Sequence, residues 1–77
     1  RGLPLVPWFY WNVYQPLDDV FFEKAKRLGY PMLVKPASLG SSIGIGWVNK
    51  EEELKRAMLE AFQYDDVVVI EKAITHL

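Results

Sequence analysis

Apolar residues occur along the chain in two patterns, which together predict four strands and two helices. Compact apolar runs rich in β-branched and aromatic residues are typical of strands. Apolar positions three or four residues apart are typical of helices that pack one face on a core. The predicted strands lie at residues 3–14, 32–34, 43–48 and 67–70, and the predicted helices lie at residues 18–28 and from Asn49 onward.

The first predicted helix has signals at both ends. Asp18 and Asp19 place two carboxylates at its N-terminus, where they interact favourably with the helix dipole. Gly29 follows the last turn as a C-terminal cap, and Pro31 prevents continuation. The apolar stripe consists of Leu17, Phe21, Ala25 and Leu28. One face of this helix should therefore pack on a core.

The second predicted helix begins with a capping pattern. Asn49 is the expected N-cap, and Glu52 lies three residues later, as in a capping box. The apolar residues that follow at helical spacing are Leu54, Ala57, Met58, Ala61 and Phe62. The charged residues between them then form a solvated face.

The strand candidates predict an α+β fold. Pro4 and Pro7 prevent full pairing of the first strand on both sides, so we expect it at an edge of the sheet. The β-branched run at residues 67–70 is typical of a well-covered strand. A loop short enough for an antiparallel hairpin joins the two middle strands. We expect a mainly antiparallel four-stranded sheet with both helices on one face.

Composition indicates one small domain. The chain has 77 residues, of which 51% are hydrophobic and 14% aromatic, and this argues for a packed unit. A domain this small is marginal alone, and the chain starts at Arg1 and stops at Leu77, so we expect residues 1–77 to be a single-domain fragment of a larger protein. Its aromatic run at residues 8–11 fills both faces of a strand, which suggests that another domain covers the outer face.

Charge and residue content argue against several classes of function. A net charge of -1 with interspersed signs gives no electrostatic basis for binding nucleic acid or an anionic membrane. No apolar run approaches the length of a membrane span, and the absence of cysteine excludes disulfides and thiolate metal sites. His76 is the only histidine, so it is interpreted as an exposed terminal residue. These features favour a cytoplasmic location.

The candidate chemistry lies between the two middle strands. Lys35 ends an apolar run, and Gly40, Ser41 and Ser42 follow with little bulk and accessible backbone amides, as required of a loop that closes over an anion. A lysine here must either extend to water or meet an anion. The order of lysine and glycines does not fit a P-loop, and Gly44-Ile45-Gly46 lacks the third glycine of a dinucleotide fingerprint. A nucleotide site and a surface lysine beside an ordinary turn both remain open.

The sequence resembles the central ATP-binding subdomain of D-alanine–D-alanine ligases, within the ATP-grasp superfamily. The resemblance is carried by VKPASLGSSIGI, with LGYP before it and NKEEELKRAMLEAFQYDDVVVIEKAI after it, and extends from about Gly2 to Ile74. The combination of VKP, GSS and a later VIEK is specific. After Ile74 this family has an Arg-Glu or Pro-Glu pair that reaches the ribose, whereas this chain has Thr75-His76-Leu77.

The resemblance implies roles for individual residues. Lys35 corresponds to the lysine that contacts the ATP phosphates and adenine, and Ser42 with the amides of residues 40–43 corresponds to the clamp on the γ-phosphate. Ser41 corresponds to a serine that joins a hydrogen-bonded gate over the substrate. The implied nucleotide-binding set is Lys35, Gly40, Ser42, Ile43, Glu71, Lys72, Ala73 and Ile74, of which Glu71 and Lys72 bind adenine and the backbone of Ala73 and Ile74 follows its edge.

The resemblance also implies what lies elsewhere. The Mg²⁺ ligands, the oxyanion arginine and the D-alanine-binding groups belong to other domains, so this chain alone is not expected to be catalytic. The family's reaction is ATP-dependent formation of the D-Ala-D-Ala dipeptide for peptidoglycan, and the parent enzyme is expected to be a homodimer. Two alternatives stay open: another ATP-grasp carboxylate–amine ligase, such as a D-alanine–D-lactate ligase, and a folding or interaction module that binds no nucleotide.

Overall fold

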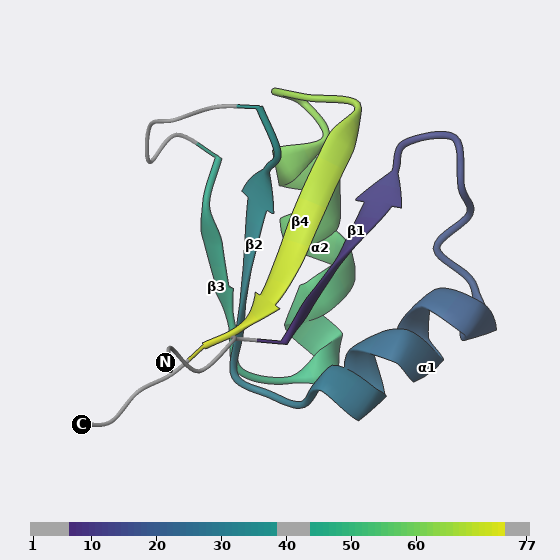
Figure 1. Ribbon diagram of the computed structural model, residues 1–77, viewed down its shortest axis with the longest axis vertical. Coiled ribbons are helices and arrows are strands. Elements are labelled where there is room, and N and C mark those ends of the chain that lie inside the picture. The colour runs from purple at the N-terminus through teal and green to yellow at the C-terminus, as the bar shows by residue number, and fades with distance from the viewer. Residues whose placement is uncertain (1–6, 39–43, 74–77) are drawn as a thin grey trace, which may run out of the picture.

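The computed structural model describes residues 7–38 and 44–73 of the chain. The elements follow in the predicted order of strand, helix, two strands, helix and strand (Figure 1). No helix in these two ranges is long and apolar enough to cross a membrane. The elements are β1 (Trp8–Asn12), α1 (Asp19–Leu28), β2 (Met32–Pro36), β3 (Gly46–Val48), α2 (Glu51–Ala61) and β4 (Val67–Lys72).

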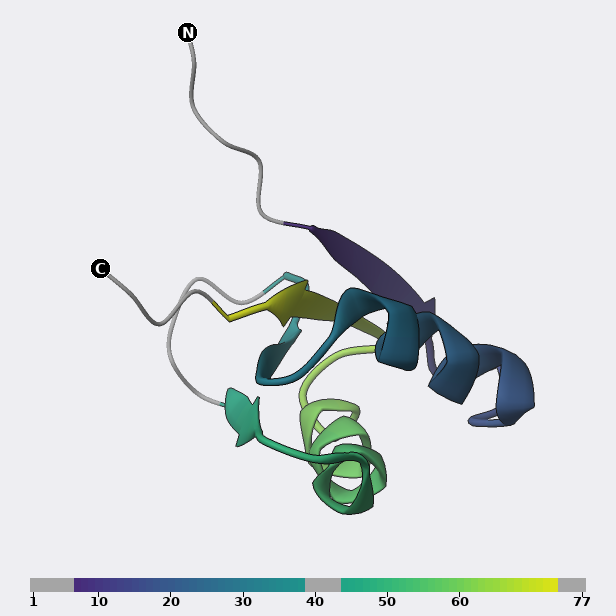
Figure 2. The ribbon, with the colours of Figure 1, turned by 90° about the horizontal axis from the view of Figure 1, so that it is seen from below.

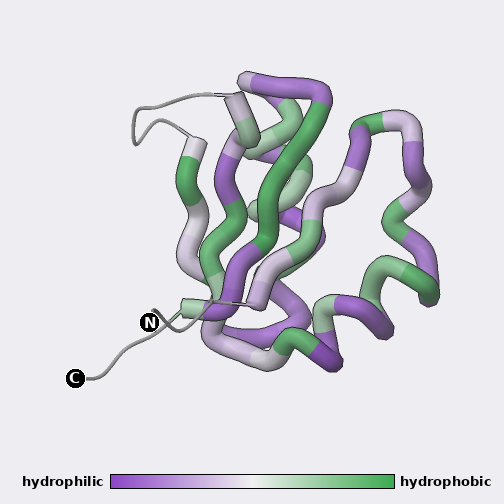
Figure 3. Tube along the Cα trace, in the orientation of Figure 1, coloured by the Kyte–Doolittle hydropathy of each residue, from purple (hydrophilic) through white to green (hydrophobic). Residues whose placement is uncertain are grey.

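The four strands form one antiparallel sheet in the order β1-β4-β2-β3. The proline-flanked strand β1 lies at an edge, as predicted, and the β-branched strand β4 lies between β1 and β2. Figure 3 shows the hydrophobic middle of β4 between its neighbours. The four-stranded α+β fold expected from the sequence is confirmed.

Both helices cover the same face of the sheet, as the view from below shows (Figure 2). The helical stripes predicted from the sequence provide their buried side: Phe21 and Ala25 on α1, and Leu54, Met58 and Ala61 on α2. Alternate strand residues complete the core, namely Trp11, Met32, Val34, Val48, Val68 and Ile70. No helix of residues 7–38 and 44–73 covers the opposite face of the sheet.

Helix α1 begins and ends where its sequence signals lie. Asp18 is the N-cap, and its side chain accepts hydrogen bonds from the backbone N–H groups of Val20 and Phe21 at 3.1 and 3.3 Å. Gly29 has a positive φ of 95° and donates its N–H to Ala25. Glycine adopts this conformation without the steric cost that a Cβ imposes.

The predicted N-cap of α2 is wrong by one residue. Lys50 is the N-cap and makes no side-chain capping bond. The Asn49 side chain instead accepts the indole N–H of Trp47 at 2.8 Å, which removes it from the helix end. Glu53, rather than Glu52, returns to the Asn49 backbone N–H at 2.9 Å. Of the two contacts of a capping box, only the one from a glutamate side chain back to a backbone N–H is present, and it is made by Glu53 in place of Glu52.

The strand bounds also differ from the predicted ones. Strand β1 stops at Asn12 because Gln15 donates its backbone N–H to the Asn12 carbonyl, which turns the chain. Strand β3 starts only at Gly46, after a residue with positive φ at Gly44. Strand β4 continues to Lys72, two residues past the prediction, because β1 pairs with it from Val67 to Glu71 and β2 pairs with it from Val68 to Lys72.

Candidate functional site

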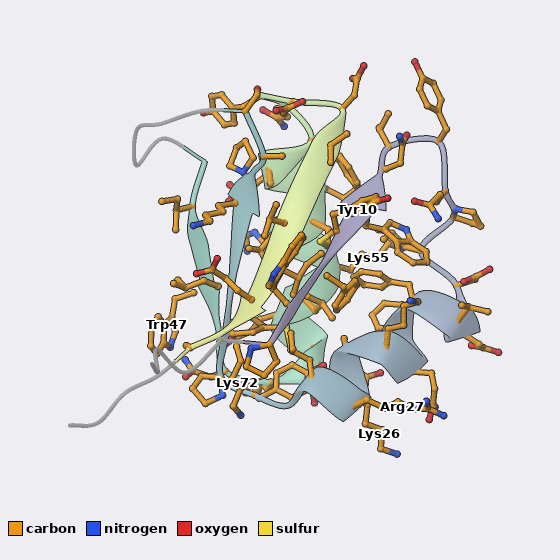
Figure 4. All side chains as sticks on the ribbon, viewed as in Figure 1. Tyr10, Lys26, Arg27, Trp47, Lys55 and Lys72 are labelled. Atoms are coloured by element: carbon orange, nitrogen blue, oxygen red, sulfur yellow. The ribbon has the colours of Figure 1, made fainter. Side chains whose placement is uncertain are left out.

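The helix-free face of the sheet, called the open face here, displays a defined row of side chains. Strand residues alternate between the two faces, so the residues between the core positions point outward. Trp8, Tyr10 and Trp47 are largely exposed there, and Figure 4 shows Tyr10 and Trp47 on opposite sides of the central strands. The open face consists of Trp8, Tyr10, Asn12, Leu33, Lys35, Trp47, Val67, Val69 and Glu71.

An ion pair lies in the middle of the open face. Lys35 Nζ is 3.2 Å from Glu71 Oε2, and the side chains are 38% and 29% exposed. Lys35 is opposite Val69 in the register and Glu71 is opposite Leu33, so the pair crosses diagonally between β2 and β4. A partly exposed ion pair contributes only about 0–1 kcal/mol, so a ligand could separate it at small cost. The sheet thus presents a cation and a carboxylate together on a surface of apolar residues.

Lys72 lies on the other side of the sheet. It is opposite Met32, a core position, and its Nζ donates to the Tyr30 carbonyl at 3.1 Å. A Cβ added at Gly29 would be 2.9 Å from the same Nζ. The structure therefore brings Lys35 and Glu71 together and ties Lys72 to the connection between α1 and β2.

Ala73 continues β4 at the bottom of the sheet. Its side chain is buried, and its backbone N–H donates to the Pro31 carbonyl at 3.1 Å. The N–H of Lys72 is likewise used by the Pro7 carbonyl at 2.9 Å. Both donors are thus committed within the described structure.

The remaining predicted site residues are Gly40, Ser41, Ser42, Ile43 and Ile74, and all five lie outside the described residues. The nearest described residues on either side of residues 40–43 are Ser38 and Gly44. Ser38 donates its backbone N–H at 2.7 Å, and also its hydroxyl, to Asp65 Oδ2. Gly44, with φ of 83°, packs against the Tyr64 ring and Pro36.

Asp65 was missed as a functional candidate in the sequence. Its second oxygen accepts the Val67 N–H at 3.2 Å, a local turn that an aspartate two residues before a strand makes predictable. The contact with Ser38 spans 27 residues, and no local pattern contains it. The Ser38 hydroxyl and N–H, followed by the Val67 N–H, lower the pKa of Asp65 below its ordinary value.

The described residues offer no metal centre. Among residues 7–38 and 44–73, no group of three or more His, Cys, Asp or Glu side chains is arranged to hold a metal ion. The chemistry available on the open face is therefore that of one cation, one carboxylate and aromatic surface.

Solved structures of D-alanine-D-alanine and D-Ala:D-Ser ligases contain a region of similar fold. The chain superimposes on D-alanine-D-alanine ligase from Coxiella burnetii with a TM-score of 0.78 and 34% identity, covering 95% of this chain and 22% of that one. It superimposes on the VanG D-Ala:D-Ser ligase from Enterococcus faecalis with a TM-score of 0.82 and 28% identity, covering 96% and 21%.

Sequence comparison identifies the family itself. Residues 1–76 match the family model described as D-ala D-ala ligase C-terminus, and the chain belongs to this family. It is 46% identical over 77 residues to D-alanine--D-alanine ligase of Staphylococcus epidermidis, covering 96% of this chain and 22% of the relative. The relative from Proteus mirabilis is 44% identical over 73 residues, covering 95% and 20%. The chain thus spans about a fifth of the length of these relatives.

Proposed function

We propose that this chain is the ATP-binding subdomain of a D-alanine–D-alanine ligase, and that its open face forms one wall of the nucleotide slot. The observation that carries the proposal is the Lys35–Glu71 pair at 3.2 Å on a sheet face that no helix covers. A phosphate group needs a cation and an adenine needs hydrogen-bonding groups beside apolar surface. These requirements are met within one patch.

Lys35 acts on the phosphates in this proposal. Its ammonium is the only Lys or Arg cation that the open face carries within the described residues. Approach of a phosphate gives the ammonium an anion of higher charge than the Glu71 carboxylate, so the ion pair can be exchanged for a contact with the nucleotide. Glu71 then becomes available to the adenine.

The other assignments come from the family. Gly40, Ser42 and Ile43 bind the γ-phosphate, Ser41 joins the gate over the substrate, and Ile74 follows the adenine edge. These residues lie outside the described part of the chain, so sequence resemblance supports them. Lys72 and Ala73 keep their assignments at the adenine end of β4, where the Lys72 side chain must leave the Tyr30 carbonyl to reach a nucleotide on the open face.

The whole enzyme would join two D-alanine molecules at the expense of ATP. One D-alanine carboxylate attacks the γ-phosphorus, ADP leaves, and an acyl phosphate forms. The amine of the second D-alanine then attacks the acyl carbon, loses a proton and displaces phosphate. Mg²⁺, held by residues outside this chain, supplies charge for the phosphates. We assign the product to peptidoglycan synthesis in the cytoplasm and expect a homodimeric enzyme.

Photolabelling tests whether the open face meets the nucleotide. The full-length ligase is irradiated with an azido-ATP analogue and Mg²⁺, and the labelled peptides are identified by mass spectrometry. We expect label in peptides from β2 or β4, and competition by unlabelled ATP. Specific label confined to other parts of the enzyme would contradict the proposal and favour a packing module without nucleotide contact.

A second candidate is a ligase with another second substrate. The similarity to the VanG D-Ala:D-Ser ligase supports it, because the same subdomain fold occurs with D-Ala and D-Ser as the named substrates. Supplying D-alanine with D-serine or D-lactate and analysing the products separates the candidates. Dipeptide from D-alanine alone supports the first candidate, and preferential mixed product supports the second.

A further inference from the structure

Two adjacent residues in the connection between α2 and β4 contact both sides of the segment 39–43. Asp65 binds Ser38, the last described residue before that segment, and Tyr64 packs on Gly44, the first described residue after it. Neither contact belongs to the open face. Both contacts lie at the end of the sheet where β2 ends and where the chain leads back into β3.

Asp65 accepts three hydrogen bonds on the N-terminal side of the segment 39–43. Ser38 provides its backbone N–H at 2.7 Å and its hydroxyl, both to Oδ2, while the Val67 N–H reaches Oδ1 at 3.2 Å. The Ala37 N–H also bonds the Val67 carbonyl at 2.9 Å. A carboxylate with three donors stays ionised, in agreement with the lowered pKa of Asp65. The chain leaving β2 is thereby fixed to the start of β4.

Tyr64 packs on Gly44, on the C-terminal side of the segment 39–43. A Cβ added at Gly44 would lie 2.8 Å from Tyr64 Cδ2 and 2.9 Å from Pro36 Cγ. The glycine backbone therefore lies directly against the ring and the proline. The contact uses the carbon ring of Tyr64, so it does not need the phenol hydroxyl.

We propose that Tyr64 and Asp65 are positioning residues for nucleotide binding, which act by fixing Ser38 and Gly44. The inference rests on the proposed function, in which residues 40, 42 and 43 contact the γ-phosphate. Neither residue needs to touch the nucleotide. Misplaced ends would displace the phosphate-binding groups while the core of the subdomain stays intact.

The test is steady-state kinetics of the full-length ligase, with melting temperature measured for every variant. Asp65→Asn removes the charge and one acceptor site, and Asp66→Asn is its matched control at an exposed neighbouring carboxylate. Tyr64→Ala removes the ring, and Tyr64→Phe keeps it. Ser38→Ala removes one donor at an exposed position.

Asp65→Asn and Tyr64→Ala should each raise KM for ATP by about three- to tenfold, less than the roughly hundredfold loss that a misplacement of about 1 Å can cause. KM for D-alanine should stay within about twofold and the melting temperature should stay near wild type, because the core is unchanged. Asp66→Asn and Tyr64→Phe should behave as wild type. Ser38→Ala should add little to Asp65→Asn, since both remove the same contact.

The variant Lys35→Ala distinguishes a failure of the positioning proposal from a failure of the proposed function. If Lys35→Ala raises KM for ATP while Asp65→Asn and Tyr64→Ala do not, the positioning role is wrong and the proposed function stands. If Lys35→Ala has no effect either, both are wrong. If Asp65→Asn lowers the melting temperature, Ser38→Ala decides: a raised KM for ATP supports positioning, and a wild-type value overturns it.

Discussion

Lys35 and Glu71 lie on the two central strands of the sheet, with Nζ and Oε2 3.2 Å apart on the face that carries no helix. Their neighbours in the register, Val69 and Leu33, are half-buried and apolar. The Glu71 carboxylate is therefore paired with the Lys35 ammonium. An anion that binds Lys35 must compete with Glu71.

This competition predicts the behaviour of Glu71→Gln. Removing the negative charge should strengthen inhibition of the full-length ligase by tripolyphosphate, which offers phosphates without an adenine, by a few-fold. Stability should change by less than about 1 kcal/mol, because the pair is partly exposed. Glu60→Gln, at an exposed position on α2, is the control. Unchanged or weaker inhibition by Glu71→Gln would show that the two residues do not compete in this way.

Gly44→Ala should destabilise the chain. Its φ of 83° costs a residue with a Cβ about 1–2 kcal/mol, and the added atom would also press on Tyr64 and Pro36. Gly46→Ala is the matched control, because its Cβ would meet only Ala57, at 3.3 and 3.9 Å, and it has no positive φ. Thermal unfolding followed by circular dichroism should show a drop of several degrees for Gly44→Ala and a smaller one for Gly46→Ala. Equal drops in melting temperature for the two variants would show that the positive φ of Gly44 does not cause the loss of stability.

Tyr30→Phe should leave stability unchanged or increase it. The Tyr30 hydroxyl is buried and has no hydrogen-bond partner among the described residues, and such a group costs about 1–3 kcal/mol. Denaturant unfolding at neutral pH measures the difference. A clear loss of stability in Tyr30→Phe would reveal a partner for this hydroxyl.

The same residue predicts a dependence on alkaline pH. Burial first, and then the charges of Glu51 and Glu52, raise the pKa of Tyr30 above its ordinary value. A raised pKa means that Tyr30 keeps its proton more firmly when folded, so its contribution is present below about pH 10 and is lost as pH rises through the folded value. Tyr30→Phe lacks this component, and its unfolding free energy should fall less steeply above about pH 10.

The isolated 77-residue chain should bind Mg-ATP weakly, in the millimolar range or not detectably. A nucleotide slot buries most of its ligand, and one open sheet face supplies a single wall. Titration followed by tryptophan fluorescence is suitable because Trp47 is 49% exposed on that face. Micromolar binding would mean that this chain alone encloses the nucleotide.

The sequence predicted the layers of this fold because each element has a strong local signal. The stripe of Phe21 and Ala25, the Gly29 cap and the proline-limited edge strand all depend on residues close in the chain. The N-cap of α2 was misplaced because the Trp47 indole takes the Asn49 side chain. That competition depends on where two side chains point, which spacing does not determine.

The candidate site was predictable only in part. The sequence resemblance identified Lys35 and Glu71 as site residues. That they contact each other depends on strand order and register, which cannot be derived from composition. The resemblance also assigned Lys72 and Glu71 together to adenine binding. Strand alternation places these consecutive residues on opposite faces of the sheet, and Lys72 donates a hydrogen bond to the Tyr30 carbonyl. The Asp65–Ser38 contact joins two distant segments, so it could be found only in three dimensions.

The most direct measurement is the affinity of the full-length ligase for ATP in wild type, Lys35→Ala and Lys55→Ala, each checked by melting temperature. Lys55 is an exposed lysine on α2, on the helix-covered side of the sheet, and serves as the control for loss of charge (Figure 4). Lys35→Ala should weaken ATP binding at least tenfold, a loss of about 1.4 kcal/mol, while its melting temperature and the affinity of Lys55→Ala stay near wild type. Wild-type affinity in Lys35→Ala, or a loss equal in both variants, would contradict the assignment of the open face to the nucleotide.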